Sequence, residues 1–137
     1  QLAGANITHE ISILGSIGHF VSINSAVEVD LEGQVNAEVI AGRQISGTGG
    51  SVDFMRAAKV SRGGRSIIAM TATAKGDSVS RIVPKVEMVT ALRTDVDLVV
   101  TEYGVADLRH ATRQKRREAL IDIAHPDFQT TLRDAIA

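Results

Sequence analysis

The chain has 137 residues, of which 44% are apolar, so residues 1–137 have the length and composition of one compact domain. Its formal charge of −1 argues against a nucleic-acid-binding module, because neutralising phosphates needs a clear basic excess. It has no cysteine, which excludes disulfides, thiolate chemistry and cysteine-ligated metal centres.

The N-terminal part of the chain predicts a weak helical segment followed by a β-hairpin. Residues 1–18 have partly helical spacing that their glycines weaken. In residues 27–31, apolar side chains alternate with acidic ones, which predicts a strand with one solvent-facing side that includes Asp30. Gly33 lies in a turn where a positive φ is favourable, and residues 35–40 form the return strand.

The middle of the chain predicts one helix and three short strands. Residues 52–60 have helical spacing and end at a glycine-containing turn. The apolar segments in residues 65–73 and 97–101 are typical of strands that are buried on both faces. Residues 81–83 form a further short strand, which Pro84 ends or leaves at a sheet edge.

The C-terminal part of the chain, from Thr112 onward, predicts two helices separated by Pro126, which we expect to end the first of them. Residues 113–117 are strongly basic; we interpret them as a solvated helix face, with a surface for an anion or a partner as the alternative. Because strands alternate with helices along the chain, we expect an α/β fold with a mixed, mostly parallel sheet covered by helices.

The sequence lacks the features of a membrane or metal protein. No apolar run approaches the roughly 20 residues that a membrane-spanning helix needs, and no charged-then-apolar signal segment opens the chain. We therefore expect a cytoplasmic protein. His9, His19, His110 and His125 do not have the spacing of metal ligands, so we expect no metal site, and we expect His125 to satisfy a helix end.

The strongest local motif is the glycine-rich segment 46–54 (SGTGGSVDF), which lies just before the predicted helix. Without a Cβ, backbone N–H groups can approach an anion or a carbonyl, which suits a phosphate, a thioester or an amide. The segment is neither a Walker loop nor a dinucleotide-binding motif. A plain strand-to-helix turn explains the same glycines, and their spacing alone leaves both interpretations open.

Five blocks follow one another along the chain: 23–36 (INSAVEVDLEGQVN), 46–54, 81–84 (RIVP), 99–109 (VVTEYGVADLR) and 123–126 (IAHP). In this order they resemble the acetyl-CoA hydrolase/transferase family, which includes 4-hydroxybutyrate, butyrate and succinyl-CoA:acetate CoA-transferases. The chain resembles the C-terminal domain of such an enzyme without its N-terminal domain. The resemblance implies a CoA-transferase-type (NagB/RpiA-like) α/β domain that faces a related domain across an active-site cleft.

The resemblance also implies a reaction. In that family a glutamate carboxylate attacks the acyl-CoA thioester to form an acyl anhydride; CoA thiolate then gives a glutamyl-CoA thioester, which a second carboxylate resolves. The resemblance places this glutamate upstream, so we expect no catalytic nucleophile in this chain. The implied ligands are acyl-CoA, with coenzyme A as substrate, and a small carboxylate such as acetate or 4-hydroxybutyrate. The implied partners are the N-terminal domain and, in the full-length enzyme, further copies of the same protein.

The resemblance implies contacts with coenzyme A at Asn24 and Gly47. An asparagine amide offers both a donor and an acceptor to a pantetheine amide, and a glycine lets the backbone approach the thioester arm. For Asn24 the alternative is a strand residue that bonds neighbouring backbone. We assign Gly49 and Gly50 to the same CoA-binding loop, where they shape the loop more than they contact the ligand.

Glu102 follows a predicted strand, and open α/β sheets gather ligands where their strands end. It is a candidate for orienting substrate or for pairing with Arg109, with an ordinary helix-start or salt-bridged carboxylate as the alternative. Lys75 is a candidate for a CoA phosphate contact or a solvated loop lysine. The chain departs from the family at His110, where members often read Asp-Leu-Arg-Gly. We carry no ligand role onto residues 1–19.

Two other functions fit the same residues. With water in place of the acceptor carboxylate, the protein is an acyl-CoA hydrolase, and the two activities differ in how well the site excludes water. A non-catalytic α/β binding domain is the third interpretation, because fold alone does not determine function.

Overall fold

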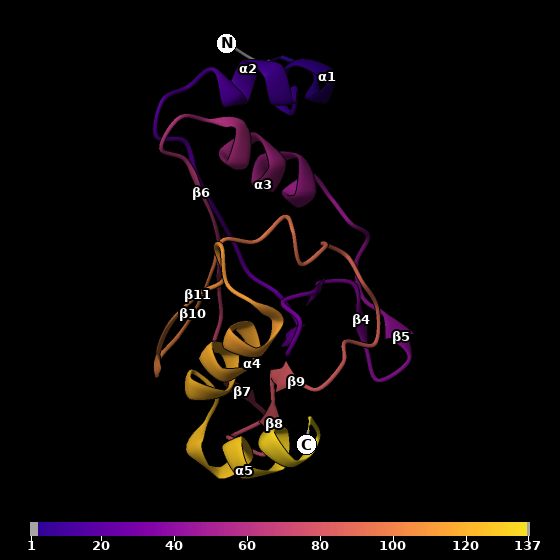
Figure 1. Ribbon diagram of the computed structural model, residues 1–137. Helices are drawn as coiled ribbons and strands as arrows, with labels where there is room; N and C mark the ends of the chain where they lie inside the picture. The colour runs from indigo at the N-terminus through magenta and orange to yellow at the C-terminus, as the bar shows by residue number, and fades with distance from the viewer. Residues whose placement is uncertain (1–2, 137) are drawn as a thin grey trace.

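The computed structural model describes residues 3–136 and contains a four-stranded main sheet (Figure 1). The strand order is β1 (Val21–Asn24), β6 (Arg65–Ala69), β10 (Leu98–Thr101) and β11 (Gly104–Asp107). The first three strands are parallel, and β11 returns antiparallel to β10. The mixed, mostly parallel sheet confirms the predicted α/β class, although the sequence pattern did not predict β11.

The structure also contains three smaller sheets, whose strands lie between those of the main sheet in the chain. In the first, β2 (Glu28–Asp30) pairs antiparallel with β3 (Val35–Asn36) and parallel with β9 (Ile82–Val83). The other two are hairpins: β4 (Val39–Ile40) with β5 (Arg43–Gln44), and β7 (Thr73–Ala74) with β8 (Val79–Ser80).

The helices lie at two levels of the molecule. The short helices α1 (Ala5–Thr8) and α2 (Ile11–Gly15) lie beside α3 (Ser51–Val60) at the top of Figure 1, and α4 (Arg113–Asp122) and α5 (Pro126–Asp134) lie below. Helix α3 confirms the prediction for residues 52–60. Helix α4 begins after Thr112, whose Oγ1 accepts the Lys115 N–H at 3.3 Å.

The prediction that Pro126 ends the preceding helix is wrong. Helix α4 ends at Asp122, and Pro126 instead begins α5, where its missing N–H leaves no hydrogen bond unmade. His125 precedes it as the capping residue: its Nδ1 accepts the Asp127 N–H at 3.3 Å, as expected for a histidine at a helix end.

The first hairpin is confirmed in part. Gly33 adopts a φ of +88° between β2 and β3, as its turn requires, but Val39–Ile40 belongs to a separate hairpin. Asp30 is only 1% exposed, so the predicted solvent-facing side is wrong at this residue. Its Oδ1 accepts the N–H groups of Glu32 and Gln34 at 3.0 and 2.9 Å, which holds the turn closed from inside.

Only one face of the main sheet is covered within the described residues. Ser66, Ile68 and Val99 are fully buried on the face against which α3 and α4 pack. On the opposite face Ile23 and Val105 are 66% and 60% exposed. The prediction that residues 65–73 and 97–101 are buried on both faces is therefore wrong: burial alternates along β6 and β10. An apolar pattern does not reveal whether anything covers the second face.

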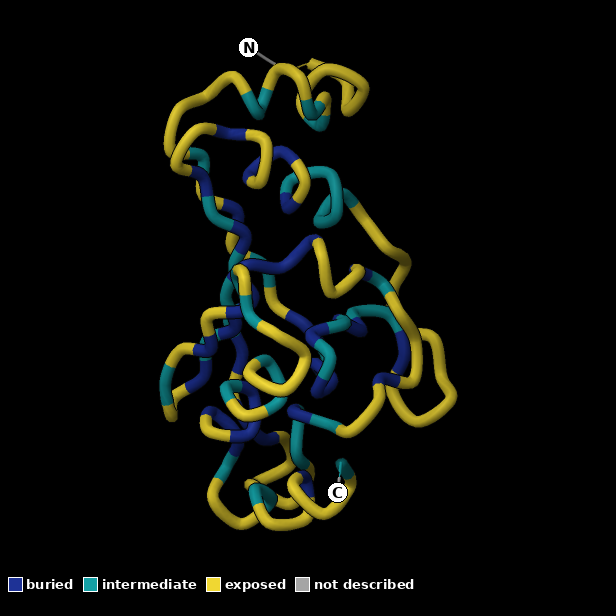
Figure 2. Tube along the Cα trace, viewed as in Figure 1, coloured by how far each residue is buried: buried dark blue, intermediate teal, exposed yellow. Residues whose placement is uncertain are grey.

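The core joins residues of the main sheet, of the smaller β2–β3–β9 sheet and of the helices α3, α4 and α5. In Figure 2 the buried segments run through the middle of the molecule, whereas the N-terminal helices are mostly exposed. The largest fully buried side chains are Leu31, Met55, Ile68, Ile82, Leu108, Leu120 and Ile121.

Candidate functional site

The three parallel strands of the main sheet end at one edge, which we call the carboxyl edge. Asn24 is the last residue of β1, and Glu102 directly follows the last residue of β10. Ligands of open α/β sheets gather at this edge, because the loops that follow the strands converge there. Two residues singled out from the sequence therefore lie where such a sheet binds its ligand.

Asn24 is half-buried and keeps part of its hydrogen-bonding capacity. Its Nδ2 donates to Ser22 Oγ at 2.8 Å, so it bonds a side chain and not neighbouring backbone. Its Oδ1 accepts no hydrogen bond within residues 3–136. An amide group has two N–H donors and one oxygen acceptor. One donor and the acceptor are thus left for a ligand.

Glu102 holds the backbone at the carboxyl edge. Its Oε2 accepts the Ala72 N–H at 2.8 Å, which fixes the segment after β6. The predicted pairing with Arg109 is wrong, because Arg109 donates to Asp107 at 2.9 and 2.5 Å. Hydrogen bonds from the Arg109 side chain outweigh the opposing effect of burial and lower the pKa of Asp107 to about 2.

Arg81 ties together the two segments that follow β1 and β6. Its guanidinium donates to the carbonyl oxygens of Ala26 and Val27 and, at 2.9 Å, to Thr71 Oγ1. Burial lowers the pKa of Arg81, and the negative charge of Glu102 opposes this effect. Both side chains therefore position backbone around the edge where Asn24 lies.

An apolar groove of about 490 Å³ lies between the β4–β5 and β7–β8 hairpins and begins at Ala26, shortly after Asn24. The sequence pattern did not indicate it, because its two walls come from segments that are far apart in the chain. Lys75, the candidate for a CoA phosphate contact, lies on one wall of this groove. Asn24 and the glycine loop do not line the groove. Its lining residues are Ala26, Val27, Glu28, Val39, Ile40, Ala41, Ala74, Lys75, Val79, Ser80, Arg81 and Glu87.

The three glycines of the 46–50 loop differ in whether their backbone conformation or their neighbours require a glycine. Gly49 has a φ of +57°, which a turn requires. A Cβ on Gly50 would collide with the ring of His9, so this glycine lets the N-terminal helices pack against α3. Neither a positive φ nor a close neighbour requires glycine at Gly47: its φ is ordinary, and no atom lies within 4 Å of the position that a Cβ would take. No hydrogen bond within residues 3–136 joins this loop to Asn24.

Residues 3–136 form neither a metal-binding cluster nor a membrane-spanning helix. Across residues 3–136 no three His, Asp or Glu side chains gather as they would around a metal ion. Over the same range no helix has the length and apolar character needed to cross a bilayer.

Comparison with known proteins connects this arrangement to a family. Residues 1–136 match the acetyl-CoA hydrolase/transferase C-terminal domain. The chain is 54% identical over 117 residues to the 4-hydroxybutyrate coenzyme A transferase of Clostridium kluyveri, covering 83% of this chain and 27% of that protein. It is 38% identical over 116 residues to the acetyl-CoA hydrolase of Kluyveromyces lactis, covering 83% of this chain and 22% of that protein.

The fold matches as well. The crystal structure of 4-hydroxybutyrate CoA-transferase from Porphyromonas gingivalis aligns with 93% of this chain and 29% of its own, with a TM-score of 0.78 and 46% identity. The chain thus spans less than a third of the length of these relatives.

Proposed function

The chain belongs to the acetyl-CoA hydrolase/transferase family, as its C-terminal domain, and on this premise we propose that it is the CoA-binding part of a CoA-transferase. The full-length enzyme moves CoA from an acyl-CoA thioester to a small carboxylate such as acetate or 4-hydroxybutyrate. The relatives named as CoA-transferases support this activity.

In the proposed reaction a glutamate from the upstream part of the protein attacks the thioester carbon and expels CoA as thiolate, leaving an acyl-glutamyl anhydride. The thiolate attacks the glutamyl carbonyl and releases the first carboxylate. The acceptor carboxylate then reverses these two steps on the glutamyl-CoA thioester. Asn24 binds a pantetheine amide, and the backbone around Gly47 borders the thioester arm. The apolar groove, with Lys75 on its wall, is the expected site for the remainder of the acyl-CoA.

The observation that carries this proposal is Gly47. Glycine is costly in a folded chain unless its conformation or its neighbours require it. Neither requires it at Gly47, where the backbone has an ordinary φ and the Cβ position is open. Gly18 shares both features, so an open Cβ position does not by itself indicate a ligand. At Gly47 the resemblance adds the reason, because it assigns a CoA contact to this residue.

The test is the Gly47→Ala substitution in the full-length protein. Because the site accommodates a Cβ, alanine should leave stability unchanged or raise it by about 0.4–1 kcal/mol. The methyl group should nevertheless raise the KM for acetyl-CoA about tenfold, the loss expected for one displaced hydrogen bond. Exchange of CoA between acetyl-CoA and labelled acetate measures the KM, and thermal unfolding measures the stability.

Gly18 provides the matched control, because it also has an ordinary φ and no atom within 4 Å of its Cβ position. Gly18→Ala should leave the KM unchanged. Equal kinetic constants for the two variants would contradict the assignment of Gly47.

Hydrolysis is the second candidate function, because a relative with 38% identity is named acetyl-CoA hydrolase. The two activities differ in the acceptor: water in the hydrolase, a carboxylate in the transferase. We expect free thiol to be released from acetyl-CoA slowly in buffer and CoA to be transferred rapidly when 4-hydroxybutyrate or butyrate is added. Thiol release that does not change with added carboxylate would favour the hydrolase.

The uncovered sheet face gives a further prediction. We expect the upstream part of the full-length protein to cover Ile23 and Val105, and the present chain alone to self-associate through them. The double substitution Ile23→Asn and Val105→Thr should shift light scattering of this chain toward the monomer. Ile17→Thr, at an exposed position outside the sheet, is the control. A monomeric unsubstituted chain over a wide concentration range would contradict this expectation.

A further inference from the structure

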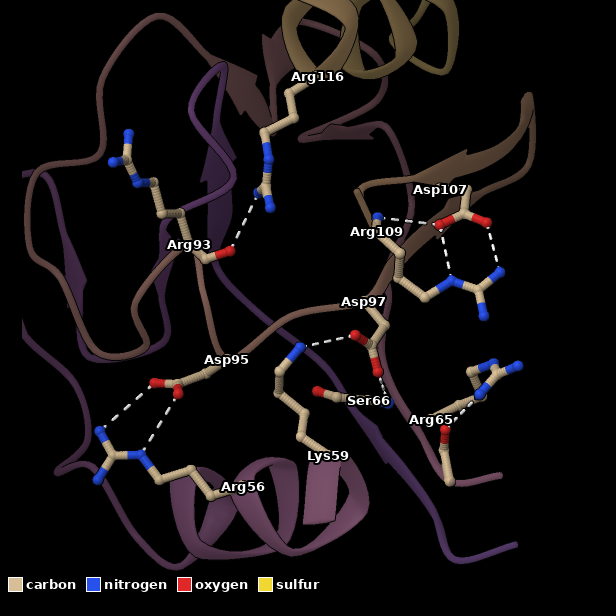
Figure 3. Close-up of polar contacts among 11 residues, drawn as sticks. Arg56, Lys59, Arg65, Ser66, Arg93, Asp95, Asp97, Asp107, Arg109 and Arg116 are labelled. Atoms are coloured by element: carbon tan, nitrogen blue, oxygen red, sulfur yellow. Dashed lines mark hydrogen bonds and ion pairs between the residues drawn. The ribbon is translucent and has the colours of Figure 1, made fainter. Parts of the chain in front are cut away.

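A cavity of about 310 Å³ lies at the opposite edge of the main sheet from Asn24, where β6 and β10 begin; we call it the amino-edge pocket. Figure 3 shows Arg116 of α4 and Lys59 of α3 entering this region from opposite sides, with Asp97 beside Lys59 and the Arg93 carbonyl beside Arg116. Its walls come from α3, the segment before β10, the segment after β11, and α4. The lining residues are Lys59, Thr94, Val96, Asp97, Leu108, Arg109, His110 and Arg116.

The carboxylates at this pocket are already paired. Asp97 is buried; its Oδ1 accepts from Lys59 Nζ at 2.8 Å and its Oδ2 accepts the Ser66 N–H at 3.0 Å. Asp107, beside the pocket, binds the fork of Arg109 (Figure 3). Neither carboxylate is therefore available to balance a further cation.

Arg116 is that further cation. Its half-buried guanidinium donates to the carbonyl oxygen of Arg93 at 3.0 Å and forms no ion pair within residues 3–136. Burial and the neighbouring charge of Arg93 lower the pKa of Arg116, and Glu32 only partly opposes them. A guanidinium has five N–H donors in a planar fork that matches phosphate, and most of them are unused here.

His110 adds a second donor group at a cost in backbone strain. Its φ is +54°, in the left-handed region that glycine adopts without penalty. It stands where the resemblance would place a glycine, and it is an exposed residue at the rim of the pocket. Strained backbone at a side chain that lines a cavity is a pattern found at binding sites.

We propose that the amino-edge pocket binds a phosphate group, held by Arg116 with His110 beside it. This inference does not depend on the proposed CoA contacts at Asn24 and Gly47. Because the remainder of the acyl-CoA is assigned to the apolar groove, the phosphate belongs to a separate phosphorylated compound. The recognising groups are N–H donors around the guanidinium of Arg116.

The test is calorimetric titration of the full-length protein with inorganic pyrophosphate, in the unsubstituted form and as Arg116→Gln. Arg116→Gln should weaken the binding about tenfold. Lys115→Gln is the matched control: it removes the same charge from the preceding residue of α4, which is exposed and does not line the pocket. No heat of binding in the unsubstituted protein, or equal weakening in both variants, would overturn the proposal.

His110→Gly gives a second test that remains informative if Arg116→Gln destabilises the fold. Because glycine relieves the strain, thermal stability should rise while pyrophosphate affinity falls, and a purely structural histidine would not produce this combination. Unchanged affinity would argue against the site. Competition tests the source of the phosphate. Neither CoA nor dephospho-CoA should displace pyrophosphate from this pocket, and displacement by either of them would contradict the assignment to a separate compound.

Discussion

The present chain by itself is expected to transfer no CoA from acetyl-CoA to another carboxylate, whereas we expect the full-length protein to transfer it. The reaction needs a glutamate whose carboxylate is free to attack the thioester, and the resemblance places that residue upstream. Each of the seven glutamates in the chain already accepts an intramolecular hydrogen bond: Glu10, Glu28, Glu32, Glu38, Glu87, Glu102 and Glu118.

Two of these glutamates, Glu28 and Glu87, line the apolar groove and are the strongest internal alternatives. Glu28 Oε1 accepts from Asn36 Nδ2 at 2.9 Å and from the Glu87 N–H at 2.8 Å. Glu87 Oε1 accepts the Gly42 N–H at 2.6 Å. A carboxylate that accepts such hydrogen bonds is a weaker nucleophile, because they stabilise its negative charge.

Exchange of label between acetate and acetyl-CoA, measured at equal molar concentrations of the chain and the full-length protein, tests this prediction. The chain should give the rate of the buffer blank. Full-length variants Glu28→Gln and Glu87→Gln should retain exchange if the nucleophile is upstream. Exchange by the isolated chain that disappears in either variant would place the nucleophile in the groove.

Asp30→Ala is expected to lower the free energy of unfolding of the chain by about 3 kcal/mol, because it leaves two partly buried N–H groups without their acceptor. Those groups belong to Glu32 and Gln34, and the Gln34 side-chain amide also donates to Asp30 Oδ2 at 2.9 Å. The substitution should open the turn between β2 and β3 and loosen the smaller sheet that ends at β9. Urea unfolding, followed by far-ultraviolet circular dichroism, measures the change.

Asp122→Ala is the control, since the Asp122 side chain is 71% exposed and its ion pair with Arg133 spans 3.6 Å. It should change the free energy of unfolding by less than about 0.5 kcal/mol. Equal effects of the two substitutions would show that the Asp30 hydrogen bonds are replaced by water and that this carboxylate does not hold the turn.

Local signals predicted well where a few neighbouring residues determine the backbone. The helix at residues 52–60 appears where its pattern indicates it, and Gly33 has the positive φ of its turn. The same signals failed at Pro126, because a proline suits both the residue after one helix and the first residue of the next. Periodicity likewise indicated Asp30 as solvent-facing, because it cannot detect backbone donors that reach a carboxylate from the protein interior.

From the amino-acid sequence alone came the α/β class, the family resemblance and the candidates Asn24 and Gly47, because these depend on residue order and on short-range backbone preferences. Only the tertiary structure decided what surrounds each candidate. It showed that Gly50 packs against His9 while Gly47 is open, and that one sheet face is uncovered within the described residues. The groove and the amino-edge pocket each bring together segments that are distant in the chain. The physical reason is that cavities and charge balance arise from packing between such segments, which local sequence patterns do not encode.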